Sequence, residues 1–310
     1  MFRNFKVLFA LSLITVFILG GCQKAEPKDT SDTLNIVATT TMLADLSGII
    51  GGNHVTVSGL MGPGIDPHLY QASAGDVTLM QNADVVVYNG LHLEGKMGEI
   101  FESLTDRGST VICIEDGLKE EDLLSWESDT AIHDPHIWFD VSLWEDAAKT
   151  VADKLSKADP AHTEDYTNNL EKYLAELDDL DTYIKDKVNE IPKEQRVLIT
   201  AHDAFNYFGR AYGFEVKGLQ GISTDAEAGT ADVSSLANFI TERKIKAIFI
   251  ESSVPPKTIE ALQAAVKAQG FNVNIGGELY SDSLGGKDSG AETYILTVKA
   301  NIDTIVKALK

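Results

Sequence analysis

The chain has 310 residues, 44% of them hydrophobic, and its 26 basic and 47 acidic residues give a formal net charge of −21. Length and composition suffice for two globular lobes of ordinary size. The negative charge would repel phosphates and therefore argues against a nucleic-acid partner, and it attracts divalent cations, although solubility is its simplest role.

The first segment predicts export. Two basic residues precede an apolar run over 7–19. Because this run is shorter than a transmembrane helix of ordinary length, residues 1–21 are interpreted as a secretory signal peptide. The end of the run, Leu19-Gly20-Gly21-Cys22, resembles a bacterial lipobox and predicts a lipid on Cys22. Residues 22–33 would then form a flexible tether. The protein is expected outside the cytoplasm, anchored to the cell membrane through Cys22.

The chain has two cysteines, Cys22 and Cys113. With Cys22 acylated, no disulfide is available. Cys113 lies in a β-rich run over 110–114 and is predicted to be a small buried residue rather than a nucleophile. In the alternative interpretation, an ordinary signal peptide is cleaved near Gly21 and Cys22 has no role.

Residues 34–158 are predicted to form the N-terminal α/β lobe. Strand-like apolar runs alternate with amphipathic helical runs, which is typical of βα units around a parallel sheet. The predicted strands are 34–38, 54–60, 84–89 and 110–114, and the predicted helices are 42–50, 74–82, 96–105 and 142–157.

Residues 159–192 are predicted to form one long linking helix. Apolar residues recur at spacings of three and four, Pro160 suits an early helical position and Pro192 a stop. Such a helix would extend roughly 40 Å, enough to run along both lobes. A coiled coil is the weaker alternative because the flanking sequence is globular. A helical connector also predicts smaller lobe movements than flexible strands would allow.

Residues 193–310 repeat the βα scheme as the C-terminal α/β lobe. The predicted strands are 196–201, 214–218, 247–252 and 272–276, and the predicted helices are 203–212, 232–243, 256–268 and 290–309. The predicted fold class is therefore α/β, with two βα-repeat lobes of mainly parallel sheets joined by one long helix.

Four side chains that suit a transition metal follow strand-like runs. They are His68 and His136, each in an Asp-Pro-His tripeptide, together with His202 and Asp282. Imidazole and carboxylate are ligands that Zn²⁺, Mn²⁺ and Fe²⁺ accept, and strand ends open onto the crevice of an α/β fold. Because the four lie far apart in the chain, they predict a preformed cleft between the lobes rather than a zinc knot.

Other polar residues are assigned lesser roles. Glu251 is expected to orient a ligand imidazole, and Asp66 and Asp134 to form turns. The remaining histidines are reserve ligands or solvated side chains; His92 and His133 fall in the first group, His54 and His162 in the second.

The chain resembles the metal-binding solute-binding lipoproteins of bacterial ABC transporters. The matching pieces, in order, are Met61-Gly62-Pro63-Gly64-Ile65-Asp66-Pro67-His68, Asp134-Pro135-His136-Ile137-Trp138, Thr200-Ala201-His202-Asp203-Ala204-Phe205, Gly218-Leu219-Gln220-Gly221, Phe249-Ile250-Glu251-Ser252-Ser253 and Tyr280-Ser281-Asp282. The resemblance implies one metal between the lobes, held by His68, His136, His202 and Asp282, an ABC permease as partner, a monomer, and no enzymatic activity.

The cargo is predicted to be Mn²⁺ in preference to Zn²⁺ or Fe²⁺. Zinc-dedicated members of the family commonly carry a loop rich in histidine and acidic residues ahead of the second histidine, whereas residues 117–131 are acidic without histidine. Affinity alone does not identify the cargo, because Zn²⁺ binds such a set at least as tightly. A metallohydrolase with Glu251 as general base and a surface adhesin are the competing functions.

Overall fold

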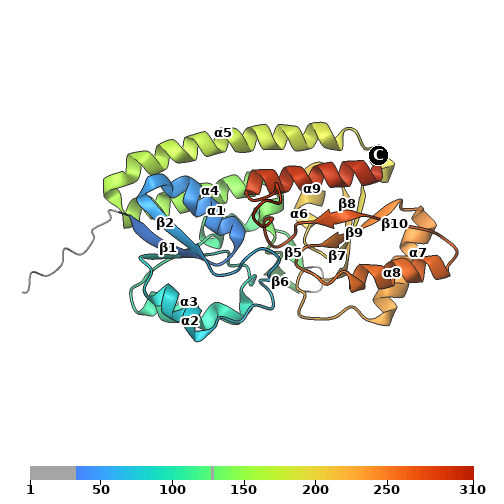
Figure 1. Ribbon diagram of the computed structural model, residues 1–310, viewed down its shortest axis with the longest axis horizontal. Helices are drawn as coiled ribbons and strands as arrows, with labels where there is room; N and C mark the ends of the chain where they lie inside the picture. The colour runs from blue at the N-terminus through green and yellow to red at the C-terminus, as the bar shows by residue number, and fades with distance from the viewer. Residues whose placement is uncertain (1–32, 127–128) are drawn as a thin grey trace, which may run out of the picture. The chain divides into compact units, whose positions relative to one another are not determined.

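Residues 33–126 and 129–310 are described by a computed structural model. The predicted signal peptide, the predicted lipidation site Cys22 and most of the predicted tether fall outside these residues. The unit formed by residues 33–310 contains the two βα-repeat halves and the long helix between them (Figure 1).

The first half is built on a four-stranded parallel sheet in the order β2-β1-β3-β4. Its strands are β1 (Leu34–Ala38), β2 (Val55–Gly59), β3 (Val85–Tyr88) and β4 (Thr110–Cys113). Ile36 and Ala38 point into one core and Val37 into another, because successive side chains of a strand face opposite sides of a sheet. Both faces are therefore covered by helices, as is usual for a parallel sheet.

The two faces of this sheet carry different helices. α1 (Thr41–Gly51) and α4 (Val141–Ala158) contribute to the core beside Ile36, and α2 (Ala74–Gln81) and α3 (Gly98–Asp106) contribute to the core beside Val37. Side-chain caps define three of the helix starts, from Thr40, Ser73 and Asp140. Each cap gives an otherwise unpaired backbone N–H of the first turn an acceptor.

The second half has two pairs of parallel strands. β7 (Val197–His202) pairs with β8 (Glu215–Gln220), β9 (Ala247–Glu251) pairs with β10 (Asn274–Leu279), and β7 lies beside β9. α7 (Thr230–Arg243) and α8 (Lys257–Ala268) pack on one face with a core of their own. α6 (Asn206–Tyr212) and α9 (Tyr294–Leu309) lie on the other face and join the core of the first half.

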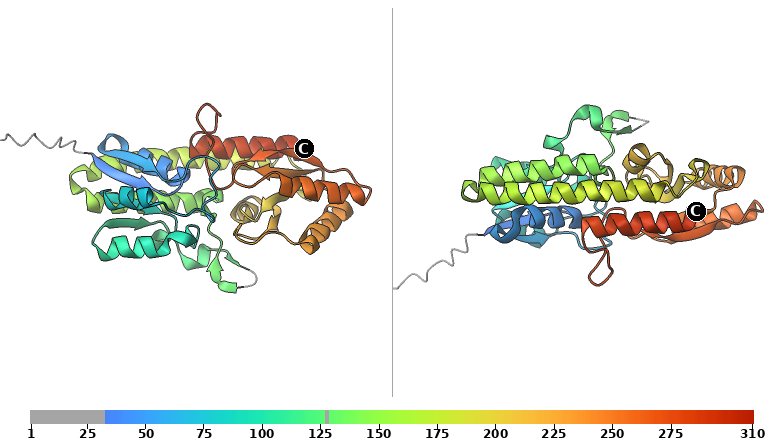
Figure 2. Two further views of the ribbon diagram at one scale, coloured as in Figure 1. Left: turned by 60° about the horizontal axis from the view of Figure 1, so that its bottom comes forward. Right: turned by 90° about the horizontal axis from the view of Figure 1, so that it is seen from above.

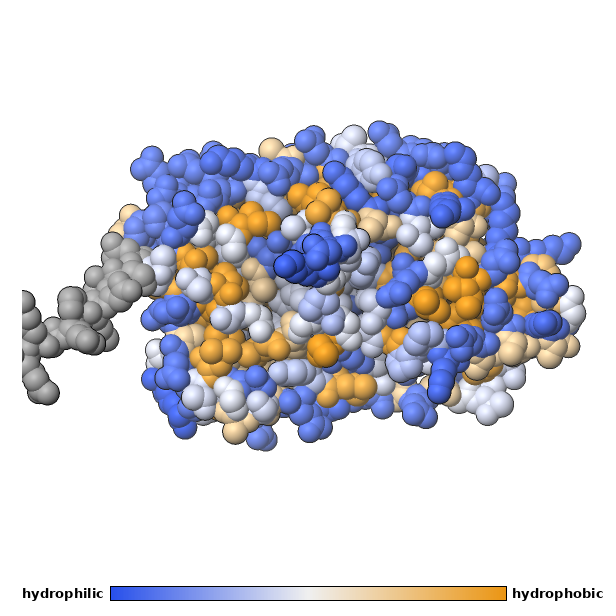
Figure 3. All heavy atoms as spheres, in the orientation of Figure 1, coloured by the Kyte–Doolittle hydropathy of each residue, from blue (hydrophilic) through white to orange (hydrophobic). Residues whose placement is uncertain are grey.

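The long helix α5 (Thr163–Val188) contacts α1, α4 and α9 (Figure 2). Its apolar face buries residues such as Tyr173 and Leu177, and hydrophilic side chains gather along its outer edge at the top of Figure 3. With 26 residues it is about 39 Å long. It starts later than predicted because Pro160–His162 forms a separate 3₁₀ turn. Asp159, just before this turn, accepts a hydrogen bond through Oδ2 from the hydroxyl of Tyr166 in α5 at 2.7 Å.

Several elements differ from the prediction. An antiparallel hairpin, β5 (Ser125–Trp126) with β6 (Asp129–His133), was not predicted, since its acidic sequence lacks a continuous apolar alternation. β7 extends through His202, and β10 ends at Leu279, three residues before Asp282. Short 3₁₀ turns complete the fold: η1 (Gly52–His54), η2 (Gly95–Met97), η3 (Glu115–Gly117), η4 (Glu120–Asp122), η5 (Ile137–Phe139), η6 (Pro160–His162) and η7 (Lys193–Gln195).

Within the described ranges, no helix combines the length and the apolar character needed to cross a membrane.

Candidate metal centre

His68 lies in a loop of the first half and is 4% exposed. Its backbone N–H donates to Asp66 Oδ1 at 2.9 Å, which closes a turn across Pro67. The second carboxylate oxygen of Asp66 accepts from the hydroxyl of Thr224, in the second half, at 2.6 Å. Asp66 therefore forms the turn that the sequence predicted, and it also receives a hydrogen bond from the other half.

His136 sits in the second Asp-Pro-His turn, just before η5, and is fully buried. Asp134 Oδ1 accepts its backbone N–H at 3.0 Å and also lies 2.6 Å from its ring Nδ1. Asn206 donates to the other oxygen of Asp134 at 3.0 Å. Asp134 thus does more than form a turn: it orients the imidazole and leaves Nε2 free. The spacing of two residues between Asp134 and His136 was the available signal for this role.

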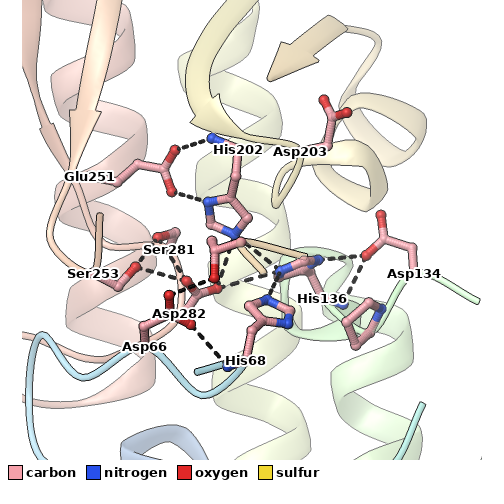
Figure 4. A network of polar contacts seen from close by, with 12 residues as sticks. Asp66, His68, Asp134, His136, His202, Asp203, Glu251, Ser253, Ser281 and Asp282 are labelled. Atoms are coloured by element: carbon pink, nitrogen blue, oxygen red, sulfur yellow. Dashed lines mark hydrogen bonds and ion pairs between the residues drawn. The ribbon is translucent and has the colours of Figure 1, made fainter. Parts of the chain in front are cut away.

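His202 is the last residue of β7 and Glu251 the last of β9. Glu251 Oε1 accepts the backbone N–H of His202 at 2.9 Å, and Oε2 lies 2.6 Å from its ring Nδ1. Both residues are buried. The carboxylate therefore fixes the ring orientation, and Nε2 of His202 points away from it toward His136 and Asp282 (Figure 4).

Asp282 is buried in the loop after β10. Its Oδ2 accepts from the hydroxyl of Ser253 at 2.7 Å, with the hydroxyl of Ser281 at 3.5 Å. Its Oδ1 has no hydrogen-bond partner among the described residues and lies 3.4 Å from Nε2 of His136 and of His202. A buried carboxylate oxygen without a partner is costly, so this atom is suited to a cation. The two serines were not singled out in the sequence, where hydroxyls after a strand carry no specific signal.

The four donor atoms converge in one place, and all lie within 4.8 Å of one another. Nε2 of His136 is 3.3 Å from Nε2 of His68 and 3.3 Å from Nε2 of His202 (Figure 4). Four atoms arranged tetrahedrally about 2.0–2.1 Å from a central ion would lie about 3.3–3.4 Å apart. Four of the six separations, those from His136 to the other three donors and that from His202 to Asp282, match such edges, so the site has about the size that a first-row divalent metal requires.

The three imidazoles differ in the direction in which their surroundings shift the pKa. Burial lowers the pKa of His68 to about 3, so this ring is neutral at physiological pH. Burial also disfavours protonation of His202, but the Glu251 and Asp282 carboxylates outweigh it and raise the pKa of this ring well above its ordinary value. Burial opposes ionisation of Asp282, yet His202 and His136 hold its pKa well below the usual range. The metal-free centre thus keeps an ionised carboxylate beside rings that bind protons.

The other four histidines lie outside this group of donors. His92 is exposed and has a left-handed backbone, and His133 is half-buried at the end of β6. His54 and His162, expected to be solvated, stack with ring centroids 3.8 Å apart. Each is paired with a nearby carboxylate, at 2.9 Å for His54 and 2.6 Å for His162.

Fold and donor set together suit a metal-binding protein with its site between two α/β halves, and comparison with known proteins identifies the family. The ZnuA family model, described as "Zinc-uptake complex component A periplasmic", matches residues 36–308. The chain belongs to this family, which confirms the resemblance to the solute-binding proteins of metal ABC transporters.

Individual relatives carry the names of different metals. The chain is 52% identical over 275 residues to the zinc-binding protein TroA of Treponema pallidum, covering 88% of each chain. It is 44% identical over 304 residues to the manganese-binding lipoprotein MntA of Bacillus subtilis, covering 98% of this chain and 99% of the relative. The solved structure of periplasmic zinc-binding TroA matches with a TM-score of 0.86 and 51% identity, over 89% of this chain and 99% of that one.

Proposed function

We propose that this protein captures a divalent transition metal outside the cytoplasm and delivers it to the permease of an ABC transporter. The observation that carries the proposal is the convergence of His68, His136, His202 and Asp282, in which a buried oxygen of Asp282 has no hydrogen-bond partner among the described residues. Relatives described as substrate-binding lipoproteins of ABC transporters support the proposal that the partner is an ABC permease. The first half supplies two donors and the second half two, so the metal adds all its interactions only when both halves are in place.

The arrangement favours capture over catalysis. A catalytic zinc keeps a coordination position open for water, whereas here four protein donors are placed to surround the ion. Glu251, the candidate general base of a metallohydrolase, has both oxygens engaged by His202. We therefore assign Glu251 the role of positioning His202.

For the cargo, sequence and geometry favour different ions. The absence of histidine from residues 117–131 favours manganese, the first candidate. The geometry favours zinc, the second candidate. Asp282 Oδ2 accepts a hydrogen bond from Ser253, so one oxygen of this carboxylate is left for the metal, as a tetrahedral zinc site requires. A five-coordinate manganese or iron site would need both oxygens of Asp282 to turn toward the ion.

The proposal includes anchoring through Cys22 and a monomeric protein. If Cys22 carries the lipid, Cys22→Ser should release the protein from the membrane fraction, because the lipid supplies the membrane affinity. A Cys22→Ser variant that stays with the membranes as tightly as the parent would contradict the lipobox. The adhesin alternative predicts instead that loss of the gene impairs attachment and leaves metal uptake intact.

Metal content and calorimetry test the main proposal. The protein purified without added metal should hold one equivalent of Mn²⁺ or Zn²⁺ per chain. His136→Ala should remain folded and bind metal at least about 100-fold more weakly, because it removes one of four donors. His92→Ala, which removes an exposed histidine outside the donor group, is the matched control and should bind as the parent does. Equal affinity of His136→Ala and the parent would overturn the site.

A further inference from the structure

The two Asp-Pro-His turns hold their histidines differently. Asp134 orients the ring of His136 directly, through the 2.6 Å contact with Nδ1. Asp66 accepts only the backbone N–H of His68, and its free oxygen is taken by Thr224. The orientation of His136 is thus fixed by the carboxylate of its own turn, whereas the turn of His68 is tied to a residue 158 positions away.

Thr224 belongs to the loop of residues 221–229, between β8 and α7, which we name the crossing loop. Thr224 is only 7% exposed, although Asp225, Ala226 and Glu227 beside it are exposed. Its hydrogen bond to Asp66 is 2.6 Å long. A short bond to a partly buried carboxylate is among the stronger kinds, and its loss leaves an acceptor without a donor.

A second contact joins the crossing loop to the first half. Lys96 Nζ lies 2.9 Å from Asp225 Oδ1, with side chains 34% and 56% exposed. Exposed ion pairs contribute little to stability, typically about 0–1 kcal/mol, and salt screens them. Thr224 should therefore dominate the attachment.

The other donors have separate attachments. The loop of Asp282, although it follows β10 of the second half, is bonded to the first half: Trp138 Nε1 donates to the carbonyl of Ser281 at 2.9 Å, and the backbone N–H of Leu284 donates to Thr41 Oγ1 at 2.7 Å. His202 is held by Glu251. The loop before His68 has one further bond to the second half, in which the backbone N–H of Gly64 donates to Ser283 Oγ at 2.8 Å. Within the Asp-Pro-His turn of His68 itself, the bond between Thr224 and Asp66 is the one that reaches the second half among the described residues.

We propose that Thr224 is a positioning residue that acts through Asp66 to hold His68 at the metal, so that release begins when the crossing loop lets His68 withdraw. The proposal rests on the metal-binding function proposed above. Release by a movement of the whole second half would instead remove His202 and Asp282 together.

Thr224→Val tests this inference, because it removes the hydroxyl and keeps the shape. Zn²⁺ release from the loaded full-length protein, followed with a fluorescent chelator in excess, should be on the order of tenfold faster than in the parent. Thr224→Ser, which keeps the hydroxyl, should restore slow release. Thr230→Val, the same change at an exposed threonine just after the crossing loop, is the matched control and should release as the parent does. Lys96→Ala should accelerate release less than about threefold.

A double-mutant cycle separates positioning from a general structural role. If Thr224 acts through His68, Thr224→Val should weaken Zn²⁺ binding in the parent but add almost nothing in a His68→Ala background. Equal effects in both backgrounds, or release from Thr224→Val at the parental rate, would overturn the inference. A parent chain that binds no Zn²⁺ would instead overturn the proposed function, so the two failures are distinct.

Discussion

At the scale of residues, the centre is organised by carboxylates that do not reach the metal position. Asp134 and Glu251 each contact Nδ1 of one imidazole at 2.6 Å and so direct Nε2 inward. Asp282 is itself fixed through Ser253. The candidate donors could be named from the sequence because the two Asp-Pro-His tripeptides, His202 and Asp282 occur together, whereas a single histidine after a strand, such as His92, is a weak signal. The supporting hydroxyls could not, because Ser253 and Thr224 gain their roles only from contacts between distant segments.

Asp282→Ala tests the choice of ion. The variant keeps three neutral imidazoles, which still suit Zn²⁺ with a water, but loses the hard anionic oxygen that benefits Mn²⁺ most. Competition titrations should show Mn²⁺ affinity falling at least about tenfold further than Zn²⁺ affinity, which corresponds to about 1.4 kcal/mol. Equal losses would mean that Asp282 fixes the arrangement of the halves rather than the choice of ion.

Cys113, predicted to be buried and found half-buried in β4, offers a separate test at this scale. Burial raises the pKa of its thiol to about 11, so only about one molecule in a thousand carries the reactive thiolate at pH 8. In a Cys22→Ser background, an alkylating reagent should label the folded protein slowly and the denatured protein rapidly. Rapid stoichiometric labelling of the folded protein would show that Cys113 is not the inert buried residue predicted from the sequence.

At the scale of elements, the βα order and most helices were predictable because hydrophobic periodicity fixes them locally. The hairpin of β5 and β6 was not, since it depends on pairing within an acidic segment. The start predicted for α5 was four residues too early, because a proline can begin a 3₁₀ turn as readily as an α-helix. The boundaries of the signal, tether, lobes and linking helix as domains stay predictions.

The buried face of α5 should dominate its contribution to stability. Leu177 is fully buried there, so Leu177→Ala is expected to lower the free energy of unfolding by about 2–5 kcal/mol through lost burial and a cavity. Leu296→Ala makes the same change at a 43% exposed position of α9 and should cost less than about 1 kcal/mol. Urea unfolding of both variants measures the difference, and similar costs would contradict the packing of α5.

At the scale of the whole molecule, folding should not require the metal. The cores of both halves are built from apolar side chains and do not include the four donors. Removal of the metal should therefore leave a folded protein with a lower Tm. At a free metal concentration of 100 times Kd, binding adds about 2.7 kcal/mol to stability. Loss of the cooperative transition on chelation would indicate a structural metal instead.

The pH dependence follows from the pKa directions. The carboxylates around His202 and His136 raise the pKa of each ring, so the metal-free centre holds protons there that a metal must displace. Metal affinity should therefore fall as the pH falls through the neutral range. Calorimetry in buffers of different ionisation enthalpy should show protons released on binding. Affinity independent of pH between 8 and 6 would contradict this linkage.

The position of α9 has a consequence for the order in which the protein forms. The helix is the last element of the second half, yet Tyr294 stacks on Trp144 of α4 with ring centroids 4.8 Å apart and donates its hydroxyl to the carbonyl of Trp138. A growing chain that has not yet produced α9 therefore leaves the core of its first half open to water. Although the first half is synthesised first, its core is completed only when α9 packs on it. We therefore expect the chain to remain incompletely folded until synthesis is nearly finished.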